Sequence, residues 1–271
     1  MKKFQNKNIL SKRFDYELGD IINALKKCNI KNGDNVYVSG NLINFGYCKT
    51  KDFKQTPNIF FKAIFKIIKN GTIIVPAHSF YLANTRKKFN LKKTKSISGS
   101  FSNFILNQKK VVRQIHPFSS SAAIGKNANF FCKKNTSNVY GPNSPFDKMI
   151  KKGTKFLSLG LPINLNCSQV HHAEYVMKVP YRYNKKFNQK IKIGNREFNK
   201  DFHMFVLKEK YLKIKRNKNK IIVNNFLKKE KLFKSKLGNN YIYSYSLSKF
   251  YKQNLNLLKK NIFCWVGKKL K

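Results

Sequence analysis

Apolar residues in the first part of the chain recur with helical spacing in two segments, each followed by a turn and a short apolar run. Residues 17–29 place apolar side chains three and four positions apart and end before a Lys-Asn-Gly-Asp turn. Residues 57–69 repeat the pattern after a proline, which favours a helix start, and an Asn-Gly pair follows them. The runs 36–38 and 72–76 predict buried strands. This repeated order of helix, turn and strand indicates α/β layering.

The rest of the chain predicts shorter elements joined by loops. We expect helices at 100–107, 146–151 and 170–177, a buried strand within 153–160, and short strands at 190–193 and 220–223 before helices near the end. No internal repeat and no clear linker divides the chain. The prediction is one domain over 1–271, with a core at about 15–185 and a basic C-terminal portion at 186–271. Its fold class is α/β, with a mixed central sheet flanked by helices and a smaller C-terminal insertion.

The charge of the chain is extreme, with 57 Lys and Arg against 11 Asp and Glu and a formal net charge of +46. Such a balance suggests a polyanionic partner, so a basic nucleic-acid-binding protein without enzymatic activity is one alternative. However, 51 of the 57 basic residues are lysine, whereas phosphate-reading proteins use the arginine fork. The lysines also occur throughout ordinary helix and strand patterns. We therefore favour compositional drift and expect no specific nucleic acid, although the charge still attracts anionic ligands.

The cysteines and the hydropathy exclude several classes of protein. Five scattered cysteines with no Cys-x-x-Cys pair predict neither a disulfide framework nor a zinc site, and we expect no metal. The N-terminus is basic but lacks the apolar region of a secretory signal. No apolar run comes near the ~18 residues that a membrane span requires. These observations predict a cytoplasmic protein without a membrane span.

One segment, residues 167–175, combines groups that can do chemistry. It follows a predicted strand and a Gly-Leu-Pro loop, which is where open α/β sheets place ligands. On a helix, His171 and Glu174 share a face because they are three residues apart. A neutral imidazole can accept a proton near pH 7, and a carboxylate beside it can orient the ring or hold a cationic substrate. Because such pairs on helices are more often structural, their spacing alone does not assign a function.

Five segments together resemble the aminoglycoside 3-N-acetyltransferase family. They are residues 33–42 (GDNVYVSGNL), 71–79 (GTIIVPAHS), 113–125 (RQIHPFSSSAAIG), 141–145 (GPNSP) and 170–174 (VHHAE). Their order and spacing match the family over about residues 15–185, whereas the remainder matches only loosely. The sequence departs from the family pattern where Gly and Asn replace the second Ser of the first segment, where Ala replaces Thr in the second, and where Val replaces Leu in the fifth.

The resemblance implies an acetyl-CoA-dependent N-acetyltransferase that acts by direct transfer. His171 is then the general base, and Glu174 orients it or binds the ammonium of the acceptor. The implied cofactor contacts are Ser39, Gly40, Asn41, Leu42, Arg113, His116, Pro117, Ser120 and Ala122. The implied substrate contacts are His78, Ser144 and Tyr175. The insertion after residue 178 is expected to help cover the acceptor.

Simpler interpretations stand beside several of these roles. His116 and Ser144 could serve only turns, His78 could be a satisfied core histidine, and the serines at 119–121 could be ordinary loop polarity. His172 points to another face of its helix and is not expected to be catalytic. A Cys167–His acyl-enzyme is the least favoured mechanism, because the resemblance implies direct transfer.

The acceptor is predicted to be an amino sugar, either an aminoglycoside antibiotic or a precursor of a surface glycan. The family's aminoglycosides are polycations that carboxylates grip, yet this chain has only four carboxylates after Glu174. A field of positive charge repels a polycation and attracts an amino sugar carried on a nucleotide. The charge therefore favours a nucleotide-linked amino sugar over an antibiotic-resistance role.

Overall fold

The computed structural model describes residues 14–50, 52–212, 226 and 232–266. The helices and strands are, in chain order, α1 (Leu18–Lys27), β1 (Asn35–Gly40), η1 (Leu42–Phe45), η2 (Phe53–Gln55), α2 (Thr56–Ile68), β2 (Thr72–His78), η3 (Phe80–Leu82), β3 (Phe89–Asn90), α3 (Ser100–Leu106), β4 (Val112–Arg113), β5 (Ser119–Gly125), α4 (Ala128–Cys132), α5 (Pro145–Lys151), β6 (Lys155–Leu159), η4 (Ile163–Leu165), α6 (Val170–Val176), β7 (Arg182–Ile193), β8 (Arg196–Leu207), η5 (Glu209–Tyr211), β9 (Phe233–Leu237), β10 (Asn240–Ser246) and α8 (Leu247–Lys260).

A seven-stranded mixed sheet forms the centre, in the order β4-β5-β2-β1-β6-β10-β9. Strands β2, β1 and β6 are parallel, whereas β5 and β10 pair antiparallel to β2 and β6. The three parallel strands are apolar and covered on both faces, as is usual for parallel strands. The mixed α/β sheet flanked by helices that the sequence predicts is thus confirmed.

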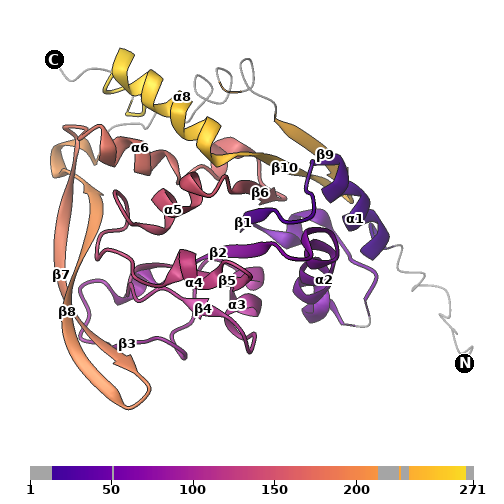
Figure 1. The fold of residues 1–271 in the computed structure, drawn as a ribbon, viewed down its shortest axis with the longest axis horizontal. Helices are drawn as coiled ribbons and strands as arrows, with labels where there is room; N and C mark the ends of the chain where they lie inside the picture. The colour runs from indigo at the N-terminus through magenta and orange to yellow at the C-terminus, as the bar shows by residue number, and fades with distance from the viewer. Residues whose placement is uncertain (1–13, 51, 213–225, 227–231, 267–271) are drawn as a thin grey trace, which may run out of the picture.

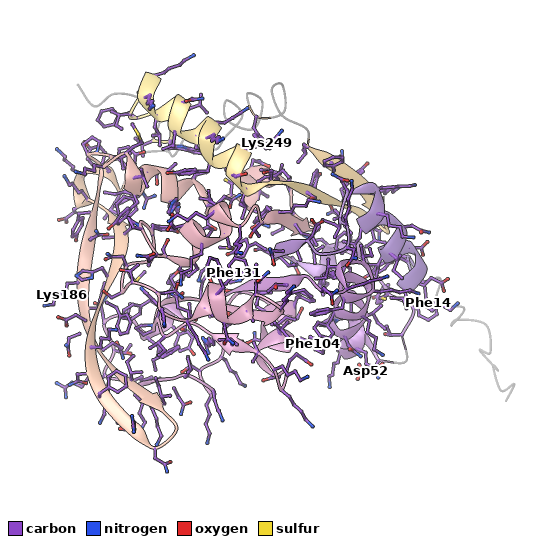
Figure 2. All side chains as sticks on the ribbon, in the orientation of Figure 1. Phe14, Asp52, Phe104, Phe131, Lys186 and Lys249 are labelled. Atoms are coloured by element: carbon purple, nitrogen blue, oxygen red, sulfur yellow. The ribbon has the colours of Figure 1, made fainter. Side chains whose placement is uncertain are left out.

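Side chains of the central strands alternate between two cores. Val36 and Val38 of β1 point into one core, which α1, α2 and α3 cover. Tyr37 between them points into the other, which α4, α5, α6 and α8 cover. Figure 1 shows α1 and α2 at the right of the view and α8 along its top. In Figure 2 the Phe131 side chain lies in the interior, where it is fully buried.

A second sheet of three strands, β3-β7-β8, projects beside the central one. Strands β7 and β8 form one long hairpin of two 12-residue strands, seen at the left of Figure 1. A small core of Leu82, Phe89, Phe118, Ile191 and Phe202 attaches this hairpin to the body of the molecule. The smaller insertion expected after residue 178 is therefore this hairpin.

The sequence placed most elements correctly and misjudged two regions. The helices expected at 17–29, 57–69, 100–107, 146–151 and 170–177 are confirmed within one or two residues at each end. The expected strand at 190–193 was far too short, because the Lys- and Asn-rich strands of the hairpin lack apolar alternation over most of their length. The middle contains β4, β5 and α4, where mainly loops were expected. The strand expected at 220–223 lies outside the described residues.

No helix among the residues that the structure describes is long and apolar enough to cross a lipid bilayer.

Candidate active site

The carboxyl ends of the parallel strands gather at one edge of the central sheet. Strand β1 ends at Gly40, beside Leu159 at the end of β6, and β2 ends at His78. The antiparallel strand β5 begins at this edge, where Ser119 pairs with His78. Open α/β sheets place ligands at this edge, and it collects several of the residues that the sequence singled out.

The predicted cofactor segment Ser39–Leu42 forms a tight turn at the edge. Its backbone is packed so closely that a Cβ on Gly40 would lie 2.0 Å from the carbonyl oxygen of Leu159. The amide of Asn41 donates to the same oxygen at 2.8 Å, and the Asn41 side chain caps η1 by accepting from the amide of residue 43 at 3.3 Å. Asn41 is exposed, whereas Leu42 turns into the core. The turn thus presents backbone and one polar side chain at the edge.

Helix α6 carries the predicted catalytic pair. A loop after β6 leads into it, and Asn166 anchors this loop by donating to Oγ of Ser158 at 2.8 Å. Val170 and Ala173 face the core and fix the orientation of the helix. The side chain of His171 keeps 25% of its surface exposed, so a ligand can reach the ring.

The carboxylate of Glu174 is buried and shared by three neighbours. Its Oε2 lies 2.5 Å from Nδ1 of His171 and 2.9 Å from Nε of Arg182, and its Oε1 accepts from the hydroxyl of Tyr181 at 2.8 Å. Burial acts to raise the pKa of Glu174, but His171, Arg182 and Tyr181 outweigh it and hold the pKa below its ordinary value. Glu174 is therefore a carboxylate at neutral pH, and it holds the ring of His171.

Aromatic side chains surround the exposed side of this pair. The ring of Tyr140 lies 6.0 Å from that of His171, and the ring of Phe205 packs against Tyr175 at 5.3 Å. A pocket of about 480 Å³ opens here; it is lined by Pro142, Tyr175, Val176, Lys178, Val179, Arg182, Tyr183, Asn184 and Phe205. The predicted substrate residue Tyr175 therefore lies at the wall of a pocket that also includes a partner of Glu174.

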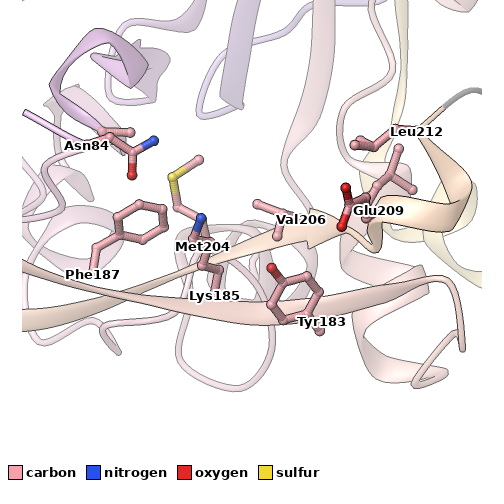
Figure 3. Close-up of a pocket in the computed structure, with 10 residues that line it drawn as sticks. Asn84, Tyr183, Lys185, Phe187, Met204, Val206, Glu209 and Leu212 are labelled. Atoms are coloured by element: carbon pink, nitrogen blue, oxygen red, sulfur yellow. The ribbon is translucent and has the colours of Figure 1, made fainter.

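A second pocket of about 400 Å³ lies along the hairpin and shares Tyr183 with the first. Figure 3 shows its lining, with Glu209 and Leu212 at one end and Asn84 at the other. Among its ten lining residues, Lys185 is the cationic side chain and Glu209 the carboxylate. Both pockets thus combine apolar walls with few charged groups, which is usual for small-molecule sites.

His78 lies at the same edge but in another environment. Its Nδ1 is 3.2 Å from Oγ of Ser119, and its ring stacks on Phe80 at 4.8 Å. Burial lowers the pKa of His78 to about 4, so the ring is neutral at neutral pH. The ring is half-buried, and its role as a substrate contact stays a prediction.

The other predicted cofactor contacts are held by protein groups. Arg113 donates to Oγ of Ser120 at 3.1 Å and to the carbonyls of Ala77 and Thr94. His116 is fully buried, and its Nδ1 accepts from the amide of Ser119 at 3.1 Å. Pro117 and Ala122 are buried as well. These side chains are buried beneath the strand edge and contact other protein groups. Their direct contact with a cofactor stays a prediction.

Two of the simpler interpretations have direct geometric support. The Oγ of Ser144 accepts from the amide of Asp147 at 3.3 Å and caps α5. His172 is buried on another side of α6, where its Nδ1 accepts from the amide of Gly141 at 3.4 Å.

Burial raises the pKa of Cys167 to about 12, so the thiol stays protonated and is a poor nucleophile near neutral pH.

Sequence reasoning missed three residues that complete the surroundings of His171, namely Tyr140, Tyr181 and Arg182. The scarcity of acids offered a signal for one of them, Arg182. A carboxylate placed on a helix that also faces a core needs buried partners, and the nearest arginine follows Glu174 by only eight residues. Among the described residues, no group of three or more His, Cys, Asp or Glu gathers as a metal site.

Comparison with known proteins identifies the family. A family model described as aminoglycoside 3-N-acetyltransferase matches residues 42–259. No curated protein matches the chain. The crystal structure of the aminoglycoside acetyltransferase AAC(3)-Xa superposes with a TM-score of 0.76 at 16% identity, over 90% of this chain and 92% of that one. AAC-IIIb, in a binary complex with CoASH, superposes with a TM-score of 0.75 at 18% identity, over 94% and 99%. AAC-VIa bound to sisomicin superposes with a TM-score of 0.75 at 16% identity, over 90% and 97%. At these identities the structures show a shared fold.

Proposed function

The chain belongs to the aminoglycoside 3-N-acetyltransferase family, and from this premise we propose that it acetylates an amino group of an amino sugar with His171 as the general base. As a member of this family it is an N-acetyltransferase, and acetyl-CoA is its acetyl donor. A non-enzymatic nucleic-acid-binding protein, the alternative that the charge suggested, does not fit this membership.

The contact between His171 and Glu174 is the observation that carries the proposal. A carboxylate that accepts from Nδ1 fixes the ring in the tautomer whose Nε2 lacks a proton. Nε2 is then the base, on a ring that is partly exposed, and Arg182, the other charged neighbour of Glu174, lines a pocket. Glu174 also stabilises the imidazolium that forms when Nε2 takes a proton.

The reaction follows from these positions. The uncharged amine of the acceptor attacks the thioester carbonyl carbon of acetyl-CoA, and Nε2 of His171 takes a proton from the attacking nitrogen. The carbon–sulfur bond breaks, and the proton goes from His171 to the leaving thiolate. The products are the N-acetylated sugar and the free thiol of coenzyme A. The oxyanion of the tetrahedral intermediate needs hydrogen-bond donors, and the exposed side-chain amide of Asn41 is the candidate donor at the strand edge.

Acetyl-CoA fits the strand edge at the turn formed by Ser39, Gly40, Asn41 and Leu42. The turn brings backbone to the surface, and Gly99 lies beside it, since a Cβ added there would lie at an ordinary contact distance of 3.7 Å from the carbonyl oxygen of Gly40. The absence of side chains at these two glycines supports the approach of a slender pantetheine arm. The charge of +46 favours the phosphates of coenzyme A.

The acceptor is better matched by a nucleotide-linked amino sugar than by a polycationic antibiotic. The two pockets contain the cationic side chains of Lys178 and Lys185 but a single exposed carboxylate, Glu209. Arg182 and Glu174 do not add to this count because both are buried and form an ion pair with each other. A polycation would meet more positive than negative groups there, whereas an anionic carrier group would be attracted.

A thiol-release assay with acetyl-CoA tests the proposal. The acceptors form two panels, aminoglycosides and nucleotide-linked amino sugars, and the His171→Gln variant runs beside the wild type. We expect turnover of the second panel and a loss of about 10²-fold or more in the variant, which is the usual contribution of a general base. The His203→Gln variant, which removes a histidine of β8 away from the pair, serves as the matched control and should retain activity.

Two results would count against the proposal. Efficient turnover of aminoglycosides alone would reverse the acceptor preference while keeping the chemistry. Undiminished turnover in His171→Gln, with acetyl-CoA binding intact, would remove His171 from the role of base.

A further inference from the structure

The carboxylate that orients His171 also lies beside a guanidinium group. Nε of Arg182 lies 2.9 Å from Oε2 of Glu174, the same oxygen that faces Nδ1 of His171. The Arg182 side chain is 6% exposed and that of Glu174 is 1% exposed, so water screens this ion pair weakly. Arg182 is itself fixed, because it donates to the carbonyl of Phe205 at 3.3 Å and lies 5.5 Å above the Phe205 ring.

We propose that Arg182 is a positioning residue for the catalytic base, because it neutralises Glu174 and thereby keeps the imidazole of His171 uncharged and ready to accept a proton. The inference rests on the proposed function only in taking His171 as the base. Arg182 is also the first residue of β7, so it ties the hairpin to the pair on α6.

The charges around Glu174 support this role. Besides His171 and Arg182, the ionisable groups that interact electrostatically with the carboxylate are Tyr140, Tyr181, Cys167 and Cys264. Burial raises the pKa of each of these four groups far above neutrality, so all of them are uncharged near pH 7. Within the described part of the chain, His171 and Arg182 are therefore the two groups that can place a positive charge directly on Glu174.

Other charged groups near α6 act on its opposite side. Asp147 and Lys151 of α5 affect His172, and Tyr251 of α8 packs against the His172 ring at 5.2 Å. The charges of Asp147 and Lys151 oppose each other in their effect on His172. The charged groups that meet at Oε2 of Glu174, beside the His171 ring, are thus the carboxylate itself and the guanidinium of Arg182.

The direction of the effect follows from charge alone. A lone carboxylate beside an imidazole favours the protonated ring, which cannot act as a base. With Arg182 present, the carboxylate already has a permanent counter-charge, and a proton on His171 would give the cluster a net positive charge. Removing the guanidinium should therefore protonate His171 at a higher pH. A larger fraction of the enzyme would then be inactive at pH 7.

The experiment compares Arg182→Met and Arg182→Gln, which remove the charge, with Arg182→Lys, which keeps it. Arg196→Met is the matched control, since it removes an arginine from the exposed start of β8 in the same hairpin. The first readout is the pH profile of kcat/KM with one acceptor throughout, so that ionisation of the acceptor contributes equally to every variant. The second is the pH titration of the His171 ring signal by NMR, assigned through its loss in His171→Gln. Circular dichroism confirms that each variant is folded.

We expect the acid limb of the profile and the His171 titration midpoint to move upward by about one pH unit in the neutral variants, the usual size of an effect from one adjacent charge. Arg182→Lys should stay near the wild type, and Arg196→Met should match it. An unshifted midpoint in a folded neutral variant overturns the inference. A lysine variant whose midpoint shifts as much as those of the neutral variants also overturns the inference, because the packing of residue 182 and not its charge would then set the midpoint. The ring titration needs no acceptor, so it decides the role of Arg182 even where the proposed acceptors are not turned over.

Discussion

Glu174 faces His171 from the interior, with Oε2 2.5 Å from Nδ1 and only 1% of the Glu174 side chain exposed. Both carboxylate oxygens already have protein partners, because Oε1 accepts from Tyr181 and Oε2 also meets Arg182. An ammonium group of an acceptor would have to displace one of these partners. Of the two roles that the sequence left open for Glu174, orienting the base is the one that this geometry supports.

The Glu174→Gln variant should therefore lose turnover and keep its affinity for the acceptor. Without the negative charge, the imidazolium formed during transfer is less stable, so we expect kcat to fall by about 10- to 100-fold, within the usual contribution of general-base catalysis. The KM for the acceptor and the binding of acetyl-CoA should change little. Steady-state kinetics with calorimetry of acetyl-CoA binding checks this. A raised acceptor KM with an unchanged kcat would instead assign Glu174 to ammonium binding.

Buried imidazoles should make the protein sensitive to mild acid. Burial, assisted by the nearby His78, lowers the pKa of His116 to about 4, and burial lowers those of His78 and His172 to about 4 as well. In the unfolded chain a histidine titrates near 6.5. Between about pH 6.5 and pH 4 the unfolded state thus binds more protons, and stability is lost as the pH falls through this range.

The His116→Asn variant isolates one of these groups. The asparagine oxygen can replace Nδ1 as the acceptor for the amide of Ser119, so the hydrogen bond is kept and the titrating ring is removed. The variant should be less stable than the wild type at pH 8, because it loses buried ring area. The difference should shrink by about 1.4 kcal/mol for each pH unit below 6.5. Urea unfolding of both proteins at a series of pH values measures this difference in the free energy of unfolding. A difference that stays constant with pH would contradict the prediction.

Ser144 should stabilise helix α5 without contributing to catalysis. Its hydroxyl satisfies the amide of Asp147 at the start of the helix. The Ser144→Ala variant should lose about 1 kcal/mol of stability, which is typical for an N-cap, and Ser144→Thr should recover most of it. Thermal unfolding gives the stability, and steady-state kinetics gives the acceptor KM, which should not move. An increase in KM without a loss of stability would restore Ser144 as a substrate contact.

The sequence predicts the parts of this fold that rest on local patterns. Helices α1 and α2 follow from apolar spacing, and β1 and β2 follow from short apolar runs that are buried on both faces. The hairpin could not be found in this way. Its strands expose lysine and asparagine along most of their length, and they are held by contacts distant in sequence, such as Phe89 with Ile191.

The candidate site likewise has one part that the sequence predicts and another that it does not. The pair on α6 could be predicted, because a spacing of three residues on a helix fixes their relation. The burial of the side chains could not be predicted, and the motif from Arg113 to Ala122 gave no sign that its side chains are buried and bonded to protein groups. Arg182 was missed although it follows Glu174 by only eight residues, because the sequence does not show that β7 brings its first residue back against α6.

The charge of the protein should make its rate depend on salt in opposite ways for the two classes of acceptor. With a formal charge of +46, long-range attraction raises the encounter rate of an anionic, nucleotide-linked amino sugar and lowers that of a polycationic aminoglycoside. Salt weakens both effects, because the screening length falls from about 30 Å at 0.01 M to about 8 Å at 0.15 M.

Between these ionic strengths kcat/KM should fall severalfold for the anionic acceptor and rise for the aminoglycoside. A monoamino sugar linked through its glycosidic oxygen to a neutral carrier, which keeps its free amine and has little net charge, provides the control and should change least. The measurement is the initial rate of thiol release at fixed, saturating acetyl-CoA and low acceptor concentration. If both charged acceptors respond to salt in the same direction, the lysine excess acts on the donor or on the fold, and the charge argument for an anionic acceptor fails.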